Sequence, residues 1–217
     1  LHVSRFTFHS PRFSSHVSRF TFHSSCIIVS GGESQAGSYL LRIRVHEDLC
    51  LRFGRFKSGK MIAVPAGEYV YVGSALGRKG GVSLGRRLVR HATRTGAKTP
   101  HKIRAEMLNI FKTIGLGTGN LLPKNGKRLF WNVDHLLNHE SVELIGVFII
   151  RTETRLEREL GQLLEQDACT QVIEKGLGAN DVPGNTHILR VPISDRDEAW
   201  WRSLPDKLNR LLRNVGY

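Results

Sequence analysis

Three groups of side chains in this sequence could together hydrolyse a phosphodiester bond. A tyrosine or histidine can accept the proton of an attacking water, an arginine can stabilise charge that develops on the phosphate, and a carboxylate can hold a divalent cation. The chain supplies these groups as Tyr39, Tyr69, Tyr71, Arg87, Arg90, His91, Glu157 and Glu159. Each residue type is common when taken singly, so this chemistry requires a fold that brings the three groups together.

Other enzyme classes have recognisable motifs, and the sequence lacks them. It contains no GxSxG nucleophile motif, no HExxH, no GxxxxGK[ST] phosphate loop and no pair of closely spaced zinc ligands. The glycine-rich run GLGTGN at 115–120 follows a predicted helix, whereas a dinucleotide-binding fingerprint follows a strand. We interpret the run as a helix end and a loop, and no motif favours an acyl-transfer or nucleotide-dependent enzyme.

One continuous stretch, 67–94, carries two of the tyrosines and all of these arginines. Tyrosine and valine alternate over 69–72, which is the period-2 pattern of a strand. Glycines interrupt the following residues and predict a loop. A helix over 83–94 then places its cationic side chains in one stripe, because residues three and four apart share a helix face. The stripe consists of Arg87, Arg90, His91 and Arg94.

The whole pattern predicts an α+β fold, with a small antiparallel β-sheet flanked by helices. The sheet is centred on strands 38–45 and 68–75, because short turns connect successive strands in this region. Helices are predicted at 83–94, 101–114 and 154–166 from their apolar spacing. Shorter elements are predicted as strands at 49–53, 61–64, 142–150 and 187–194 and as a helix at 130–138.

Composition divides the chain into three parts. In residues 1–36 the segment HVSRFTFHS occurs twice and the first acid is Glu33. This Arg- and Ser-rich, acid-poor composition is typical of a transit peptide, and the alternative is a disordered or non-native extension; we assign the segment no function. Residues 37–194 form the predicted domain. Residues 195–217 are predicted to contain an amphipathic helix that covers the core.

The net charge of +13 is concentrated in one window. Residues 69–133 hold thirteen Lys and Arg residues and a single acid, Glu106. Such a field attracts polyanions, since each phosphate that is neutralised releases bound counterions. We expect a nucleic-acid partner, DNA rather than RNA, and the alternative is a solvated basic face.

Hydropathy and cysteine usage favour a cytoplasmic protein. The longest apolar run, Leu144 to Ile150, is too short to span a bilayer. The three cysteines, Cys26, Cys50 and Cys169, are scattered, which argues against a disulfide framework or a zinc cluster. We expect no membrane contact and no obligate protein partner.

Three segments, taken in order, resemble the GIY-YIG nuclease superfamily. GSYLL at 37–41, YVYVGSA at 69–75 and LGRRLVRH at 84–91 are similar to its Gly-x-Tyr strand, its Tyr-x-Gly strand and its arginine-bearing helix. More closely, the chain is similar to an archaeal and bacterial branch with a GIY-YIG-like domain of unknown function. WNVDHLL at 131–137 and GLGANDVPGNTHIL at 176–189 are similar to further motifs of that branch, so the resemblance extends over about 37–191.

The resemblance implies a divalent-metal-dependent endonuclease and gives roles to individual residues. Tyr39 and Tyr71 would flank the attacking water, one of them as the base. Arg87 would contact the scissile phosphate, with His91 assisting. Glu157 would hold Mg²⁺ or Mn²⁺. The expected nucleic-acid contacts are Gly73, Arg78, Lys79, Arg90 and Arg94.

The metal-ligand role of Glu157 has two alternatives. Glu159 lies at a similar angle from the apolar face of its helix, so it is the second candidate for the metal ligand. Glu157 also follows Thr154 by three residues, which is the spacing of a capping box, and a purely structural role is therefore open. At the level of function, the alternative is a non-catalytic nucleic-acid-binding module on the same fold.

The chain departs from the family pattern at three places. Asn132 stands where the branch has a histidine, which weakens a proposal that this segment supplies a base. The two cysteines of the C-terminal motif are absent, which argues against a metal there. A basic insertion at 95–128 separates the cationic helix from Trp131, and it either widens a nucleic-acid groove or decorates the fold.

Overall fold

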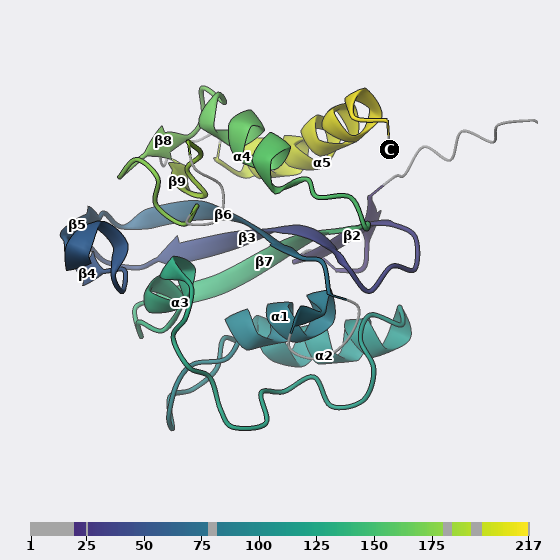
Figure 1. Ribbon diagram of the computed structural model, residues 1–217, viewed down its shortest axis with the longest axis horizontal. Helices are drawn as coiled ribbons and strands as arrows, with labels where there is room; N and C mark the ends of the chain where they lie inside the picture. Colours follow the sequence, from purple (N-terminus) through teal and green to yellow (C-terminus); the bar gives the residue numbers. More distant parts are fainter. Residues whose placement is uncertain (1–19, 25, 78–81, 180–183, 192–196, 217) are drawn as a thin grey trace, which may run out of the picture.

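A mixed β-sheet runs through the middle of the molecule, with helices on both of its faces (Figure 1). The computed structural model describes residues 20–24, 26–77, 82–179, 184–191 and 197–216. Within these residues the strand order is β1-β2-β7-β3-β6-β9-β8, and β2 pairs with β7 in parallel while the other neighbours are antiparallel. The strands are β1 (Thr21–Phe22), β2 (Ile27–Gly31), β3 (Gly37–Val45), β6 (Gly67–Ala75), β7 (Val142–Arg151), β8 (Gln171–Val172) and β9 (Ile188–Val191).

The α+β class predicted from the sequence is confirmed, but the sheet is larger than the small antiparallel sheet that was expected. The unpredicted strands β1, β2 and β8 enlarge it, and the strands predicted at 142–150 and 187–194 are present as β7 and β9. A separate hairpin of β4 (Leu49–Arg52) and β5 (Met61–Val64) lies at one end of the sheet, with a 3₁₀ turn at Phe56–Gly59 between its strands.

The central strands are buried on both faces, so the sheet separates two apolar cores. Successive side chains of a strand point to opposite faces. In β3, Tyr39 and Leu41 therefore enter one core while Leu40 enters the other. Both cores exclude water from their central side chains, and their burial is the main driving force for the fold.

The helices form two layers. One face of the sheet is covered by α1 (Leu84–His91), α2 (Ile103–Thr113) and α3 (Asn132–Leu137), and the other face by α4 (Glu157–Glu165) and α5 (Asp197–Asn214) (Figure 1). The predicted C-terminal amphipathic helix is α5, whose buried residues Trp201, Leu204 and Leu208 pack into the second core. No helix in the described residues is both long and apolar enough to cross a membrane.

The prediction that residues 1–36 form an extension without structure was wrong for its last part. Ile27–Gly31 belongs to the predicted extension, yet as β2 it pairs along its whole length with β7, so folded structure begins before residue 37. The physical reason is its run of β-branched side chains, Ile27, Ile28 and Val29, which are buried in the apolar cores on the two faces of the sheet. Residues 1–19 lie outside the described residues.

The insertion at 95–128 is more than a decoration of the fold. Its helix α2 buries Met107 and Phe111 completely, and the following loop buries Leu116 in the same core. Removing these side chains would leave a large gap in the layer that α1, α2 and α3 form on this face of the sheet. The insertion therefore completes the core beneath α1.

Candidate functional site

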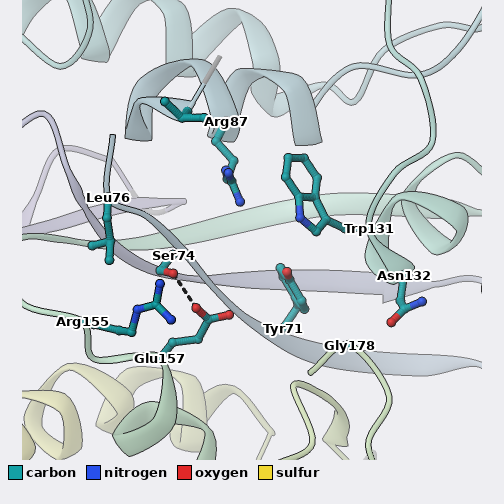
Figure 2. Close-up of a pocket in the computed structure, with 10 residues that line it drawn as sticks. Tyr71, Ser74, Leu76, Arg87, Trp131, Asn132, Arg155, Glu157 and Gly178 are labelled. Atoms are coloured by element: carbon teal, nitrogen blue, oxygen red, sulfur yellow. Dashed lines mark hydrogen bonds between the residues drawn. The ribbon is translucent and has the colours of Figure 1, made fainter. Parts of the chain in front are cut away.

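A cavity of about 280 Å³ opens where β6 loses its neighbouring strand (Figure 2). The pairing of β9 with β6 extends only from Glu68 to Tyr71. Beyond that point the described residues place no strand on this side of β6, so side chains from both faces of the sheet reach one space. The polar and aromatic residues that line it include Tyr71, Ser74, Arg87, Trp131, Arg155 and Glu157.

Arg87 points into the cavity from α1 (Figure 2). Its guanidinium carbon lies 4.1 Å from the centroid of the Trp131 ring, a cation–π contact. No carboxylate among the described residues pairs with it, and its buried Nε has no hydrogen-bond partner there. Arginine presents a planar set of donors that matches a phosphate, so Arg87 has the geometry and the unpaired charge to bind one.

Glu157 enters the cavity from the opposite layer, as the first residue of α4. The Ser74 hydroxyl donates a hydrogen bond to its Oε2 (Figure 2), and its Oε1 lies 3.4 Å from Nδ1 of the buried His187. Burial raises the pKa of the Glu157 carboxyl, but the contacts with His187 and Ser74 outweigh it and hold the pKa below its ordinary value. Glu157 is therefore ionised at neutral pH.

The capping-box alternative for Glu157 was wrong. That motif places the glutamate three residues into a helix capped by Thr154, whereas α4 begins at Glu157 and its N-cap position is Leu156. The carboxylate contacts β6 rather than the helix end. Glu159, the second candidate, does not line the cavity, and so the geometry favours Glu157 as the ligand of a cation there.

The two predicted water-flanking tyrosines occupy different places. Tyr71 lines the cavity, but Tyr39 is fully buried behind it, with its hydroxyl 2.9 Å from Nε2 of His91. Burial raises the pKa of Tyr71 well above its usual range and raises the pKa of Tyr39 in the same direction. Both hydroxyls therefore keep their protons at neutral pH, and only Tyr71 can contact a molecule in the cavity.

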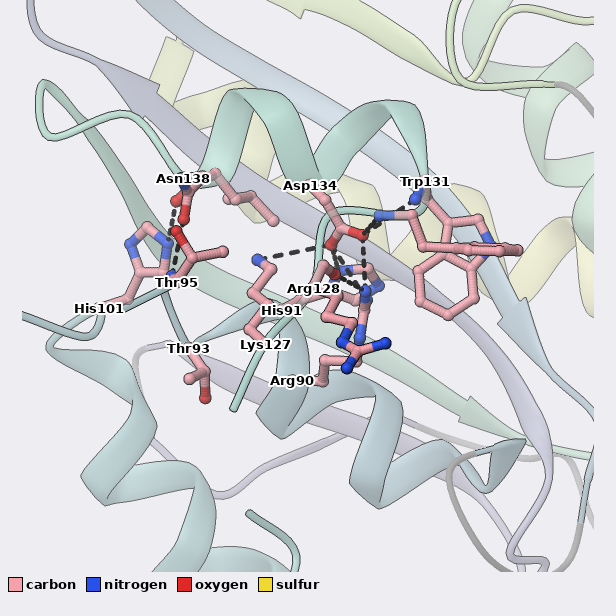
Figure 3. Close-up of polar contacts among 12 residues, drawn as sticks. Arg90, His91, Thr93, Thr95, His101, Lys127, Arg128, Trp131, Asp134 and Asn138 are labelled. Carbon is pink, nitrogen blue, oxygen red and sulfur yellow. Dashed lines mark hydrogen bonds and ion pairs between the residues drawn. The ribbon is translucent and has the colours of Figure 1, made fainter. Parts of the chain in front are cut away.

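His91 lies in an internal polar network rather than in the cavity (Figure 3). Its Nδ1 is 3.5 Å from Oδ1 of Asp134, and burial lowers its pKa to about 4. A neutral imidazole suits this position, because its Nε2 can accept a hydrogen bond from the Tyr39 hydroxyl while its Nδ1–H faces Asp134. Its role is thus to position Tyr39, and direct assistance at a phosphate is excluded by its burial.

Asp134 is the centre of this network. Arg90 donates to both of its oxygens, at 3.1 and 2.8 Å, and Lys127 approaches to 3.4 Å (Figure 3). The backbone N–H groups of Phe130 and Trp131 also donate to it, each at 2.9 Å. Burial raises the pKa of Asp134, but its contacts with His91, Lys127 and Arg90 reverse the shift and lower the pKa far below its ordinary value.

Three of the predicted nucleic-acid contacts are structural instead. Arg90 is paired with Asp134, and Arg94 is buried, where it donates to the carbonyls of Thr99 and Val142. Gly73 faces Tyr39 across the β3–β6 pair, and a Cβ at 73 would lie 2.5 Å from the tyrosine hydroxyl. Its missing side chain thus makes room for a tyrosine, not for a ligand. The other two, Arg78 and Lys79, lie outside the described residues.

Four residues of the site were given no role from the sequence. Ser74, Trp131 and His187 fall within the matched motifs, whereas Arg155 lies outside them; His187 does not line the cavity but contacts Glu157 from behind it. Trp131 precedes α3 and so faces α1, while His187 ends the connection into β9 and reaches α4 beneath Gly161, where a Cβ would lie 3.0 Å from the ring. These contacts join segments that are distant in the sequence, so no local sequence pattern predicts them.

The cavity suits a cation that keeps most of its own water. Among the described residues, no group of three or more His, Cys, Asp and Glu side chains could enclose a metal ion. Mg²⁺ commonly takes only one or two protein carboxylates and completes its shell with water and substrate phosphate. The ionised Glu157 fits that requirement, and Mn²⁺ accepts the same oxygen ligands.

Comparisons with known proteins give one result. No curated protein and no solved structure matched the chain. A family model described as "Domain of unknown function DUF123" matches residues 38–209. This range includes every cavity residue described above as well as most of α5. The chain therefore belongs to the DUF123 family.

Proposed function

We propose that this protein is a divalent-metal-dependent endonuclease that hydrolyses phosphodiester bonds in DNA. The observation that carries the proposal is the placement of Arg87 and Glu157 in one cavity, from opposite layers of the fold, with Tyr71 between them. An unpaired guanidinium and an ionised carboxylate are what a phosphodiester and its cation require. The resemblance to GIY-YIG nucleases supports the same assignment.

Each cavity residue has a distinct role in this reaction. Arg87 binds the scissile phosphate, and its contact with Trp131 holds the guanidinium in place. Glu157 holds Mg²⁺ or Mn²⁺, which neutralises charge on the phosphate, and Ser74 fixes the orientation of the carboxylate. Tyr71 directs its hydroxyl toward the attacking water. Arg87 lowers the pKa of Tyr71 against the larger effect of burial, and so favours the phenolate form, which is the form that could accept the proton of the water.

One observation favours a second candidate, a nucleic-acid-binding module without cleavage activity. The pKa of Tyr71 is raised well above its usual range by burial, and a protonated phenol is not a base. The cavity and its arginine would then bind a phosphate without activating water. The two candidates share a partner and differ in chemistry, so one assay separates them.

We further propose a cytoplasmic location. Two of the three cysteines, Cys50 and Cys169, are exposed at separate sites. Exposed thiols persist in a reducing compartment.

The test is nicking of supercoiled plasmid in Mg²⁺ or Mn²⁺ by the parent protein and by Arg87→Ala and Glu157→Gln. Each substitution removes one element of charge stabilisation in the transition state, so we expect a loss of about 10²–10³ in rate. DNA affinity should change much less, because many other cations contact the backbone. Cleavage should require the metal and stop in EDTA.

Two matched controls accompany these variants. Arg86→Ala removes the same charge from the neighbouring position, outside the cavity, and should cleave within a few-fold of the parent. Glu159→Gln removes a carboxylate two residues further along α4, outside the cavity, and this variant should also cleave. A parent protein that binds DNA but cleaves nothing with either metal would refute the endonuclease and support the binding module. Loss of cleavage in Glu159→Gln alone would transfer the metal to Glu159.

A further inference from the structure

Phe130 is an exposed aromatic side chain beside the cavity. It leaves 77% of its surface in solvent, the largest exposed fraction of any large hydrophobic residue that the structure describes. Val82, which lines the cavity, is 54% exposed, and Leu129 next to Phe130 is 39% exposed. Single exposed apolar residues are ordinary, but here Val82 lines a charged cavity and Phe130 contacts Trp131, which also lines it.

The position of Phe130 is fixed from beneath. Its backbone N–H donates to Oδ2 of Asp134 at 2.9 Å, so the buried network anchors the segment that carries it. Its ring lies against the ring of Trp131, with centroids 5.0 Å apart and an interplanar angle of 77°. Trp131 in turn contacts Arg87. The exposed ring is therefore held one side chain away from the arginine that would bind a phosphate.

This arrangement has the two parts of a single-strand binding site. Proteins that bind single-stranded nucleic acid combine a cationic path for the backbone with aromatic rings on which bases stack. Arg87 and the exposed Arg128 supply the cations, and Phe130 supplies the ring face. Bases inside a duplex are already stacked on one another, so only an unpaired base has a face to offer.

We propose that Phe130 stacks on an unpaired nucleobase next to the phosphate bound by Arg87, and that the substrate is single-stranded nucleic acid or a duplex with an unpaired nucleotide. This inference rests on the proposed function for its phosphate at Arg87, but it concerns recognition rather than cleavage. A non-catalytic binding module would select its ligand in the same way.

The test is equilibrium binding of fluorescein-labelled oligothymidylate and of a fully paired duplex of equal length, with EDTA present so that no cleavage occurs. Phe130→Ala should weaken single-strand binding by roughly 5- to 150-fold, the range expected for one stacked base. Duplex binding should change by no more than about twofold, because phosphate contacts carry it. Phe130→Trp should restore single-strand binding, whereas Phe130→Leu, which keeps the apolar volume without a ring face, should not.

Phe22→Ala is the matched control, because Phe22 is also an exposed phenylalanine, at 64%, but lies beside α5 rather than at the cavity. It should leave both affinities unchanged. The inference is overturned if Phe130→Ala binds single strands like the parent, if it weakens single strands and duplex equally, or if Phe130→Leu restores binding as well as Phe130→Trp. If Phe130 passes these tests but the parent cleaves nothing with metal, the endonuclease proposal alone fails.

Discussion

Arg87 and Arg90 lie three residues apart on α1, and both place their guanidinium over the ring of Trp131, at 4.1 and 4.3 Å. Arg90 is paired with Asp134 through two hydrogen bonds, in an internal network that also holds His91 and Lys127. Arg87 faces the cavity with no carboxylate partner among the described residues. The two neighbouring arginines thus lie in different environments. The charge of Arg90 is paired within the fold, whereas the charge of Arg87 has no carboxylate partner.

The difference has an energetic meaning. A charge removed from water is costly unless it is paired and hydrogen-bonded. Asp134 meets that requirement for Arg90, whereas the half-buried Arg87 contacts the Trp131 ring and the Tyr39 side chain but no carboxylate among the described residues. Two charges one helical turn apart thus differ in their pairing, and the charge of Arg87 is available to an anion. The predictions below separate the two regions, beginning with the largest effect.

Replacing Asp134 by Asn should destabilise the protein by about 3–5 kcal/mol, because the buried cations Arg90 and Lys127 would lose their counter-charge. The buried Lys127 should be affected most by the loss of its counter-charge, since burial already lowers its pKa to about 8. The measurement is the free energy of unfolding in urea. As a control, Glu157→Asn removes the carboxylate of the cavity and should cost less than half as much. Equal losses at the two sites would contradict the division into a structural network and a functional cavity.

Acid should weaken the network through His91. Its pKa is lowered to about 4 in the folded protein, so the unfolded chain binds a proton below pH 6.5 that the folded chain does not. The stabilisation is complete above pH 6.5 and is lost as the pH falls toward 4, by about 3 kcal/mol. His101 and His135 have pKa values lowered in the same direction and add to the effect.

The contribution of His91 is isolated by comparing unfolding free energies of the parent and His91→Gln at pH 7 and pH 4.5. The variant is expected to start less stable, because Tyr39 and Asp134 lose a partner, but to lose less stability on acidification. Parallel pH curves for the two proteins would show that His91 is not the group that titrates.

The two arginines give the most direct comparison. Arg90→Ala should lower the unfolding free energy by roughly 1.5–3 kcal/mol, the cost of hydrogen bonds to a charged group, and Arg87→Ala should change it by less than about 1 kcal/mol. DNA cleavage should show the opposite order: Arg87→Ala should lose cleavage rate although it remains folded. A strong destabilisation by Arg87→Ala would mean that its charge is used by the fold after all.

The sequence predicts most of the elements and, on each side of the cavity, one charged residue. Apolar periodicity places α1, α2, α4 and α5 within a few residues of their observed bounds, since each helix buries one face. It also identifies Arg87 and Glu157, with the help of a family resemblance. The sequence cannot identify the partner of each charge. Arg87 and Arg90 belong to the same cationic stripe on α1, and only the fold shows that Asp134, more than forty residues away, pairs with Arg90 rather than with Arg87.

Long-range pairing limits the prediction in the sheet as well. The parallel pair of β2 and β7 joins residues more than a hundred positions apart, and no local signal in Ile27–Gly31 specifies a partner. The acid-poor composition around β2 obscured its β-branched run. Ser74 and His187 were missed for the same reason, because their contacts with Glu157 exist only once α4 packs across the sheet.

The smallest expected effect tests the orientation of Glu157. Ser74 donates to Oε2 of Glu157, and this bond is one of the contacts that lower the carboxyl pKa. Ser74→Ala should cost about 0.5–1.5 kcal/mol of stability at most and should raise the pKa of Glu157. Because a protonated carboxyl cannot hold the cation, the acidic limb of the pH–rate profile for cleavage should move to higher pH. Ser74→Thr keeps the hydroxyl and should restore the parent profile. An acidic limb that stays in place in Ser74→Ala would show that His187 alone maintains the ionised carboxylate, and would shift the orienting role from β6 to the connection before β9.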